Sequence, residues 1–210
     1  MKKTKLIIAS ILFLGISVSC KKEVEPEPTP TNPDTAIAIT TLANINVGNH
    51  NSTDFGSFIN LKTGTIYQLS TNAKAVDNQS LVDLVYYYNQ FNENEPYIGA
   101  PTTLGSNGAI GGLYDSNPDG INFWTTVNNT EFTAANDISV GDFNAIANLA
   151  DLKAKWGTLN FGLYYSYHVM SEKIYRFKTV GNKIGLLKIN TIVGSSQTIG
   201  TMNIDVKIQQ

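Results

Sequence analysis

Along Lys173-Ile174-Tyr175-Arg176-Phe177-Lys178, polar and apolar side chains alternate. This two-residue period predicts a half-buried strand. Gly181-Asn182 supplies a turn and residues 184–189 resume as a second strand, a pattern that predicts a hairpin. After another turn at residues 194–196, residues 201–208 alternate again. The apolar positions of this last segment share one face: Met202, Ile204, Val206 and Ile208. We predict three antiparallel strands in meander order.

Earlier segments have a similar character. Residues 36–47 are β-prone, and residues 58–61 and 65–67 flank Lys62-Thr63-Gly64, which predicts a tight hairpin. Residues 81–88 form a near-continuous apolar run, which is typical of a strand at the centre of a sheet.

A helical period appears in one segment. Ser139 and Asp142 have the spacing of a capping box, apolar residues follow at helical intervals, and Gly157 provides a stop. A shorter polar helix is expected around residues 71–78. Residues 89–136 are rich in Gly, Asn, Thr and Pro, which predicts long loops where a binding site would lie. The expected fold is mainly β, an antiparallel sheet or sandwich-like domain with one or two short helices and long loops.

The N-terminus has the features of an export signal. Lys2, Lys3 and Lys5 precede an apolar run at residues 6–16, and small residues lead to Cys20, the single cysteine. We predict that residues 1–19 are a lipoprotein signal peptide and that Cys20 is acylated. An ordinary secretory signal cleaved nearby would leave a free thiol instead. An uncleaved anchor helix is disfavoured, because a membrane span needs about 20 apolar residues.

Residues 20–35 are expected to form a stalk, since they alternate Pro with Glu and Thr, a composition that favours extended polyproline II. Residues 36–210 are enough for a single β-rich domain with an enclosed core.

The charge of the chain excludes some partners. Removing the signal peptide lowers the Lys+Arg count from 15 to 12 and leaves 17 Asp+Glu, a formal charge of −5. A basic stripe is the usual footprint of nucleic-acid binding, so nucleic acid is not an expected partner. Membrane attachment would come from the lipid anchor and not from charge.

Asp115-Ser116-Asn117-Pro118-Asp119-Gly120 copies the opening of a calcium loop, in which Asp115, Asn117 and Asp119 would supply oxygen ligands. The twelfth position of such a loop is a bidentate Glu, and here it is Thr126. The same residues also make a strong turn, which is the favoured interpretation.

The two histidines are His50 and His168. His50 lies in a polar turn and is expected to be a solvated loop residue. His168 and Met170 share a face if residues 164–170 form a strand, so each is a candidate haem ligand, although two ligands on one face do not bracket one iron. The plainer interpretation is a half-buried pair on a strand.

No nucleophile elbow, zinc-protease motif or phosphate-binding glycine loop is present, so the chain is not expected to be an enzyme. Tyrosine clusters and two tryptophans supply aromatic surface that could stack on sugars or a porphyrin. Alternation along a strand turns half of each cluster inward, so most of these rings are expected in the core.

Two segments carry a family resemblance. Residues 172–188 are similar to a C-terminal hairpin of Bacteroidota surface lipoproteins, and residues 58–64 with residues 82–86 resemble a section of the HmuY-like haem-binding lipoproteins. The resemblance implies an antiparallel β fold that holds a haem-like ligand by its loops. Val82 replaces the family's Trp before Asp83, and the paired axial histidines have no match beyond His168. Glu23, Glu25 and Glu27 resemble the acidic export signal of such lipoproteins, which implies a lipid-anchored outer-membrane protein at the cell surface.

These features together predict a non-enzymatic, membrane-anchored binding protein for haem or another small nutrient ligand. The alternative is a structural or adhesive lipoprotein that binds glycan or a protein partner.

Overall fold

The computed structural model describes residues 32–50, 52, 55–71, 73–89, 95–104, 117–157, 164–194 and 198–210. These residues belong to one compact unit, Asn32–Gln210. The expected signal peptide, Cys20 and most of the expected stalk lie outside them.

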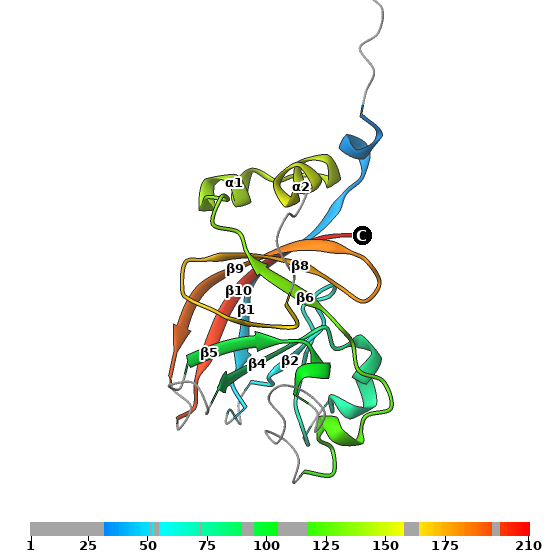
Figure 1. Cartoon of the computed structure of the whole chain (residues 1–210), viewed down its shortest axis with the longest axis vertical. Helices are drawn as coiled ribbons and strands as arrows, with labels where there is room; N and C mark the ends of the chain where they lie inside the picture. The colour runs from blue at the N-terminus through cyan, green and yellow to red at the C-terminus, as the bar shows by residue number, and fades with distance from the viewer. Residues whose placement is uncertain are drawn as a thin grey trace, which may run out of the picture. The chain divides into compact units, whose positions relative to one another are not determined.

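The unit contains two antiparallel five-stranded sheets, so the expected mainly β fold is confirmed. Sheet A has the order β1-β10-β9-β8-β6, and sheet B has the order β3-β2-β4-β5-β7. Figure 1 shows the two sheets packed face to face. The strands of sheet A are β1 Ile39–Gly48, β10 Thr201–Gln209, β9 Ile184–Val193, β8 Ile174–Lys178 and β6 Glu131–Ala134. Those of sheet B are β3 Ile66–Tyr67, β2 Phe58–Ile59, β4 Leu84–Asn89, β5 Glu95–Gly99 and β7 Ser166–His168.

Most of the predicted strands are confirmed, with two corrections. The strand expected at residues 81–88 begins only at Leu84. The strand expected to be half-buried at residues 173–178 is buried on both faces, because apolar side chains of residues 138–152 pack against its outer face. Strands β8, β9 and β10 are neighbours in meander order, β2 and β3 form the predicted hairpin, and β4 is the central strand of sheet B. The alternating face of β10 is buried throughout: Met202, Ile204, Val206 and Ile208.

The main core lies between the sheets. It combines that face of β10 with Tyr175 and Phe177 of β8, and with Leu84, Tyr86 and Tyr88 of β4. Burying a large apolar side chain contributes roughly 1.5–3 kcal/mol, so this layer is the main source of stability.

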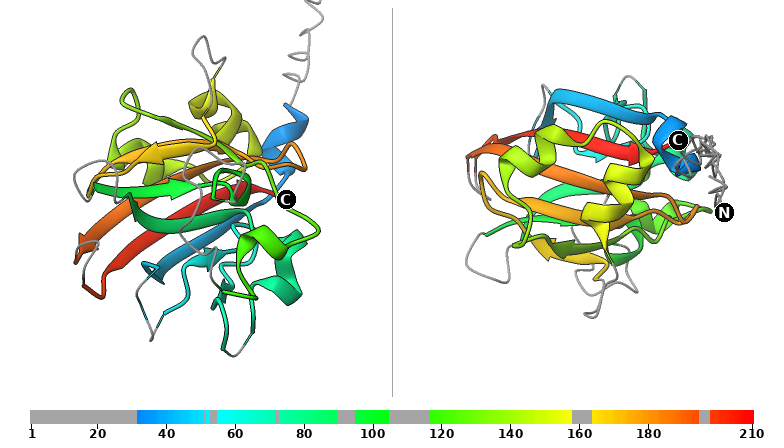
Figure 2. Two further views of the ribbon diagram at one scale, coloured as in Figure 1. Left: turned by 60° about the horizontal axis from the view of Figure 1, so that its bottom comes forward. Right: turned by 90° about the horizontal axis from the view of Figure 1, so that it is seen from above.

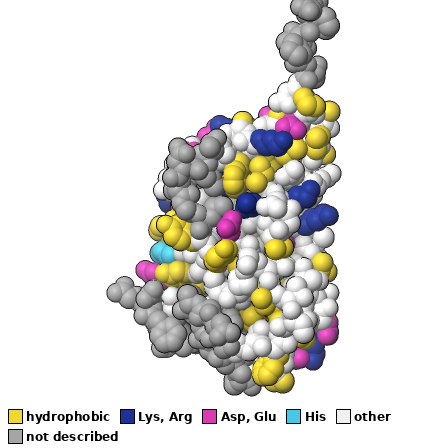
Figure 3. All heavy atoms as spheres, turned by 45° about the vertical axis from the view of Figure 1, so that its right-hand side comes forward, with side chains coloured by type: hydrophobic (Ala, Val, Ile, Leu, Met, Phe, Trp, Pro, Cys, Tyr) yellow, Lys and Arg dark blue, Asp and Glu magenta, His cyan; other side chains and the backbone are white. Residues whose placement is uncertain are grey.

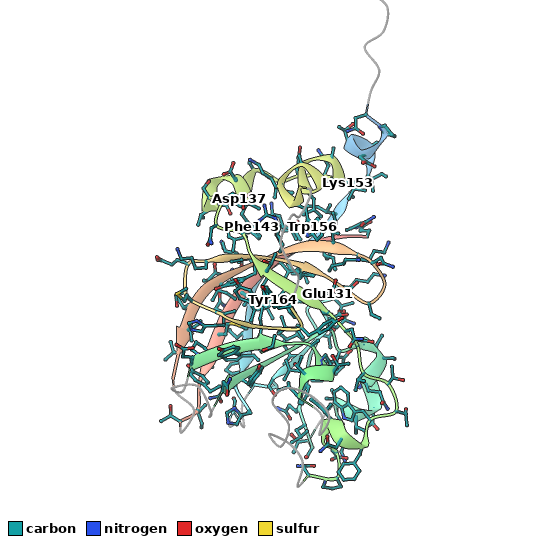
Figure 4. The ribbon with its side chains drawn as sticks, viewed as in Figure 1. Glu131, Asp137, Phe143, Lys153, Trp156 and Tyr164 are labelled. Carbon is teal, nitrogen blue, oxygen red and sulfur yellow. The ribbon has the colours of Figure 1, made fainter. Side chains whose placement is uncertain are left out.

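Two short helices, α1 Val140–Ala145 and α2 Leu149–Trp156, cover the outer face of sheet A. Seen from above in Figure 2, they lie across its strands. In Figure 4, Phe143 and Trp156 point from these helices toward the sheet. The predicted capping box at Ser139 and Asp142 is present. The single helix expected up to Gly157 is wrong, because the chain is extended at Ile146.

The break between α1 and α2 has two physical causes. The Lys207 ammonium donates hydrogen bonds to the carbonyls of Asn144 and Ile146, which removes acceptors that a continuous helix would use. The Asn148 side chain then accepts from Asp151 N–H and caps a new helix. The apolar residues keep a helical spacing through the break, but these two interactions stabilise two separate helices instead of one.

Three short 3₁₀ segments, η2 Val76–Leu81, η3 Pro101–Thr103 and η4 Ile121–Phe123, lie along the outer side of sheet B. A second apolar cluster forms there, and it includes Phe58, Val85 and Trp124. The polar helix expected at residues 71–78 is therefore a 3₁₀ segment that begins later. The long loops expected over residues 89–136 are only partly correct, since β5 and β6 fall inside that range.

The folded unit begins at Asn32, four residues before the expected start at residue 36. Asn32 caps the 3₁₀ segment η1 Pro33–Ala36, and Asp34 forms an ion pair with Lys153 of α2 at 2.7 Å. None of the helices in the part of the chain that the structure describes has the length and hydropathy of a membrane span.

Candidate functional site

Strand β7 connects the edges of the two sheets. Its residues pair with β5, the neighbouring strand of sheet B. Just before it, Tyr164 pairs with Phe132 of β6, the edge strand of sheet A, through N–H to carbonyl distances of 2.7 and 2.9 Å. Figure 4 shows Tyr164 between the levels of the two sheets. This segment therefore lies at the side of the sandwich, where both sheets end.

A groove of about 520 Å³ opens beside this segment. This volume lies within the range of about 300–1,000 Å³ that is common for small-molecule sites. Four of its lining side chains are tyrosines. The lining residues are Tyr97, Ala134, Asn136, Tyr164, Ser166, Tyr167, His168, Met170, Lys173 and Tyr175.

Three of the tyrosines are in contact along one side of β7. The ring centroids of Tyr164 and Tyr167 are 5.9 Å apart, and those of Tyr167 and Tyr175 are 5.6 Å apart. The Tyr175 hydroxyl accepts a hydrogen bond from Met170 N–H at 2.9 Å. Since Tyr175 is only 2% exposed, this bond fixes the chain after β7 to the core of the sandwich.

The opposite face of β7 carries His168. The strand register places His168 directly across from Tyr97, and their ring centroids are 5.5 Å apart. Tyr97 in turn stacks on Tyr87 at 5.9 Å, and the Tyr87 hydroxyl is hydrogen-bonded to Ser166 at 2.7 Å. Glu95 Oε2 lies 3.9 Å from His168 Nδ1. The imidazole is therefore held by its contact with the Tyr97 ring. Because Glu95 lies near Nδ1, Nε2 is the ring nitrogen that could contact a ligand.

Part of this aromatic surface is accessible. Tyr164 is 56% exposed, Tyr165 46% and Met170 52%, which is high for large apolar side chains. Figure 3 shows a surface on which hydrophobic side chains gather, with a histidine beside an acidic group. Exposed aromatic rings beside a groove can stack on a flat ligand ring, while the tyrosine hydroxyls supply hydrogen bonds to its polar edge.

The structure brings together the two predicted ligand-binding residues, His168 and Met170, in one groove. His168 is the last residue of β7, and Met170 follows shortly after the strand. His168 is half-buried, whereas Met170 is exposed. The predicted strand at residues 164–170 is shorter than expected and covers Ser166–His168.

His50 differs from the expected solvated loop residue. It lines a smaller hollow of about 200 Å³ with mostly polar residues, including Ser57 and Gln68. Its Nδ1 accepts from Tyr88 N–H at 3.4 Å, and its buried Nε2 has no hydrogen-bond partner among the described residues. Burial lowers the pKa of His50, because desolvation disfavours the charged imidazolium.

Of the three predicted calcium ligands, Asp115 lies outside the described residues. Asn117 Oδ1 accepts from Asp119 N–H at 2.9 Å, the bond of an Asx turn. Asp119 Oδ2 pairs with the Lys74 ammonium at 2.9 Å, and Asn117 is hydrogen-bonded to Ser70. The described part of this segment is thus organised as a turn. Within the described ranges, no group of three or more His, Cys, Asp or Glu side chains is placed to hold a metal ion.

Sequence reasoning missed Tyr97, Tyr175 and Lys173 as groove residues. It placed most tyrosines in the core, which is correct for Tyr86, Tyr87 and Tyr88. The pairing of Tyr97 with His168 depends on the register between β5 and β7, and no local pattern in the sequence specifies that register. Lys173 follows the turn before β8, and no local sequence pattern marked it as a groove residue.

Comparisons with protein-family models, curated proteins and solved structures returned no match to this chain.

Proposed function

We propose that this chain is an exported, lipid-anchored, non-enzymatic binding protein that holds a small ligand with a flat ring in the tyrosine-lined groove. Haem is the leading candidate ligand. The observation that carries the proposal is the meeting of His168, Met170 and four tyrosines in one groove at the side of the sandwich.

The groove residues fit such a ligand. Tyrosine rings provide flat apolar faces, and His168 offers a nitrogen that can bind iron. Glu95 near Nδ1 would orient the imidazole so that Nε2 is the ligating atom, as acidic partners commonly do for metal-binding histidines. Met170 lies nearby as a soft thioether. Bound haem would supply its own iron chemistry, and the protein would supply the cavity and the orientation.

The groove is less suited to catalysis. Ser166 and His168 are the lining residues that could act as nucleophile and base, but the Ser166 hydroxyl is hydrogen-bonded to Tyr87. This arrangement supports binding as the role of the groove.

A second candidate function is glycan binding. It is favoured by the exposure of Tyr164, which lines the groove together with the polar side chains of Asn136 and Ser166. Sugar rings stack on such tyrosines without any contribution from His168.

Titration of the mature chain with haemin tests the proposal. A saturable shift of the Soret band is expected, and His168→Ala should abolish it because the iron loses its nitrogen ligand. His50→Ala is the matched control and should keep the shift, since His50 lies in a different hollow. A flat spectrum for the wild-type chain would contradict haem binding. Binding of an oligosaccharide that Tyr164→Ala removes and His168→Ala leaves intact would instead support the glycan alternative.

A further inference from the structure

Among the described residues that line the groove, Lys173 is the one with a permanently charged basic side chain. Its side chain is exposed, and it forms no ion pair with any of the residues that the structure describes. Several other cations of the domain are already engaged. Lys74, Lys153, Lys155, Lys188 and Arg176 each pair with an aspartate.

The position of Lys173 follows from the strand pattern. Residues two apart in an extended chain share a face, so Lys173 lies on the same side as Tyr175. Tyr175 belongs to the core between the sheets, whereas Ile174 packs under the helices on the other face. The ammonium therefore extends from the end of β8 on the side where the groove opens.

The backbone at Lys173 is firmly held. Its carbonyl accepts from Ile189 N–H at 2.9 Å, and the preceding Glu172 N–H donates to the Ile189 carbonyl at 2.8 Å. Because both bonds join the segment to β9, the base of the Lys173 side chain is fixed relative to the tyrosines. A fixed base lowers the entropy that the side chain loses when it binds an anion.

The charge of the groove opposes that of the whole chain. Among the residues that the structure describes, its lining contains Lys173 and no carboxylate, while the chain has 17 Asp+Glu against 15 Lys+Arg. Glu95, the acidic group nearest to His168, is not part of the lining. A lone cation among tyrosine rings favours an anionic group on the ligand, because a carboxylate forms charge-assisted hydrogen bonds with an ammonium.

We propose that the ligand of the groove carries a carboxylate, which Lys173 Nζ holds while the ring of the ligand stacks on the tyrosines. This inference rests on the proposed binding function and narrows its ligand class to ring compounds with an acidic substituent. A porphyrin with propionate side chains and an acidic sugar share this chemistry.

Two matched pairs of probes test the inference on the mature chain. The first pair is metal-free protoporphyrin IX and its dimethyl ester, followed by porphyrin fluorescence. The second pair is a glucuronic-acid-containing oligosaccharide and its neutral glucose counterpart, followed by calorimetry. The metal-free porphyrins remove any contribution from iron ligation by His168. Lys173→Gln is the test variant. Lys178→Gln, at the far end of β8 and outside the groove lining, is the control.

The acid is expected to bind about two- to fivefold more tightly than its neutral partner, as a partly exposed ion pair allows. Lys173→Gln should bring this ratio close to one and leave the affinity for the neutral probe unchanged, while Lys178→Gln should keep the ratio. The ratio should also fall as ionic strength rises from about 0.01 M to about 1 M, because the Debye length shrinks from about 30 Å to about 3 Å.

The outcomes separate this inference from the proposed function. If the neutral probe binds as tightly as the acid, or Lys173→Gln leaves the ratio unchanged, the carboxylate inference is overturned and the binding function stands. Binding of the porphyrin pair would identify a porphyrin as the source of the carboxylate, and binding of the oligosaccharide pair would identify an acidic sugar. If none of the four probes binds to the wild-type chain, both the inference and the proposed function are overturned.

Discussion

Asp83 is a half-buried carboxyl group beside the central strand of sheet B. Burial raises its pKa to about 6, and the hydrogen bond that Leu61 N–H donates to it at 3.0 Å offsets only part of this effect. The unfolded chain has the ordinary, lower pKa. Between the two values the folded state therefore binds a proton that the unfolded state does not.

This difference gives a prediction with a definite sign. The stability contributed by Asp83 is fully present below its ordinary pKa and is lost as the pH rises to about 6. At neutral pH, Asp83→Asn should be more stable than wild type by about 1–3 kcal/mol, taking about 1.4 kcal/mol for each pH unit. The gain should vanish near pH 4, as judged from the ordinary carboxyl pKa of about 3.9.

Urea unfolding of both proteins at several pH values measures the effect. Asp77→Asn is the matched control, because Asp77 is exposed on the neighbouring η2 segment. A gain for Asp83→Asn that does not change with pH would show that the carboxyl group is not held as the structure indicates.

Arg176 fixes helix α2 to sheet A. Its side chain is only 3% exposed, and it donates to the carbonyls of Lys155 and Trp156 at the end of α2, each at 2.9 Å. It also forms a two-point ion pair with Asp137, whose pKa is lowered chiefly by this hydrogen bonding. A planar guanidinium can serve all of these acceptors at once, whereas an ammonium cannot.

Arg176→Lys is therefore expected to lower the free energy of unfolding by about 2 kcal/mol, since two carbonyls lose donors worth about 1 kcal/mol each. Asp137→Asn should cost less than about 1 kcal/mol, because the Asp137 side chain is 69% exposed. Chemical unfolding of both variants measures the difference. Equal losses in the two variants would mean that the ion pair, and not the helix end, is what Arg176 stabilises.

Local patterns predict the strands better than they predict the helices. The alternation along β10 was sufficient, because its apolar face is buried and most of its polar face is not. The alternation along β8 identified a strand but not its burial, since α1 and α2 cover its outer face and four of its five residues are buried. The break at Ile146 depends on Lys207, whose ammonium reaches carbonyls far away in the sequence. Strands β5 and β6 escaped notice because each is short, and Pro96 and Gly99 mask the pattern of β5.

Only the part of the candidate site that lies close together in the sequence could be predicted. His168 and Met170 lie close in sequence, so one strand pattern linked them. Tyr97 and Tyr175 join them only through the pairing of β7 with β5 and the packing of the sheets against each other. Long-range pairing of this kind leaves no trace in a local window of sequence.

For the chain as a whole, we predict that the domain is tethered through Cys20. Cys20→Ala removes the thiol that acylation requires, so the mature protein should leave the membrane fraction and become soluble. Lys21→Ala keeps the thiol and should remain with the membranes. Cell fractionation followed by immunoblotting measures this. Continued membrane retention of Cys20→Ala, after extraction of peripheral proteins, would mean that something other than a lipid holds the chain.

The central claim is that the groove beside β7 is where this protein binds its ligand. The most direct measurement is a set of amide nitrogen–proton NMR spectra of the ¹⁵N-labelled mature chain, recorded during titration with protoporphyrin IX. We expect progressive, saturable shifts of the amides that cluster at Tyr97, Tyr164, Tyr167, His168 and Lys173. The amides around His50 and Asn117 should not shift. Shifts centred elsewhere on the domain, or no shifts at a saturating concentration, would contradict it.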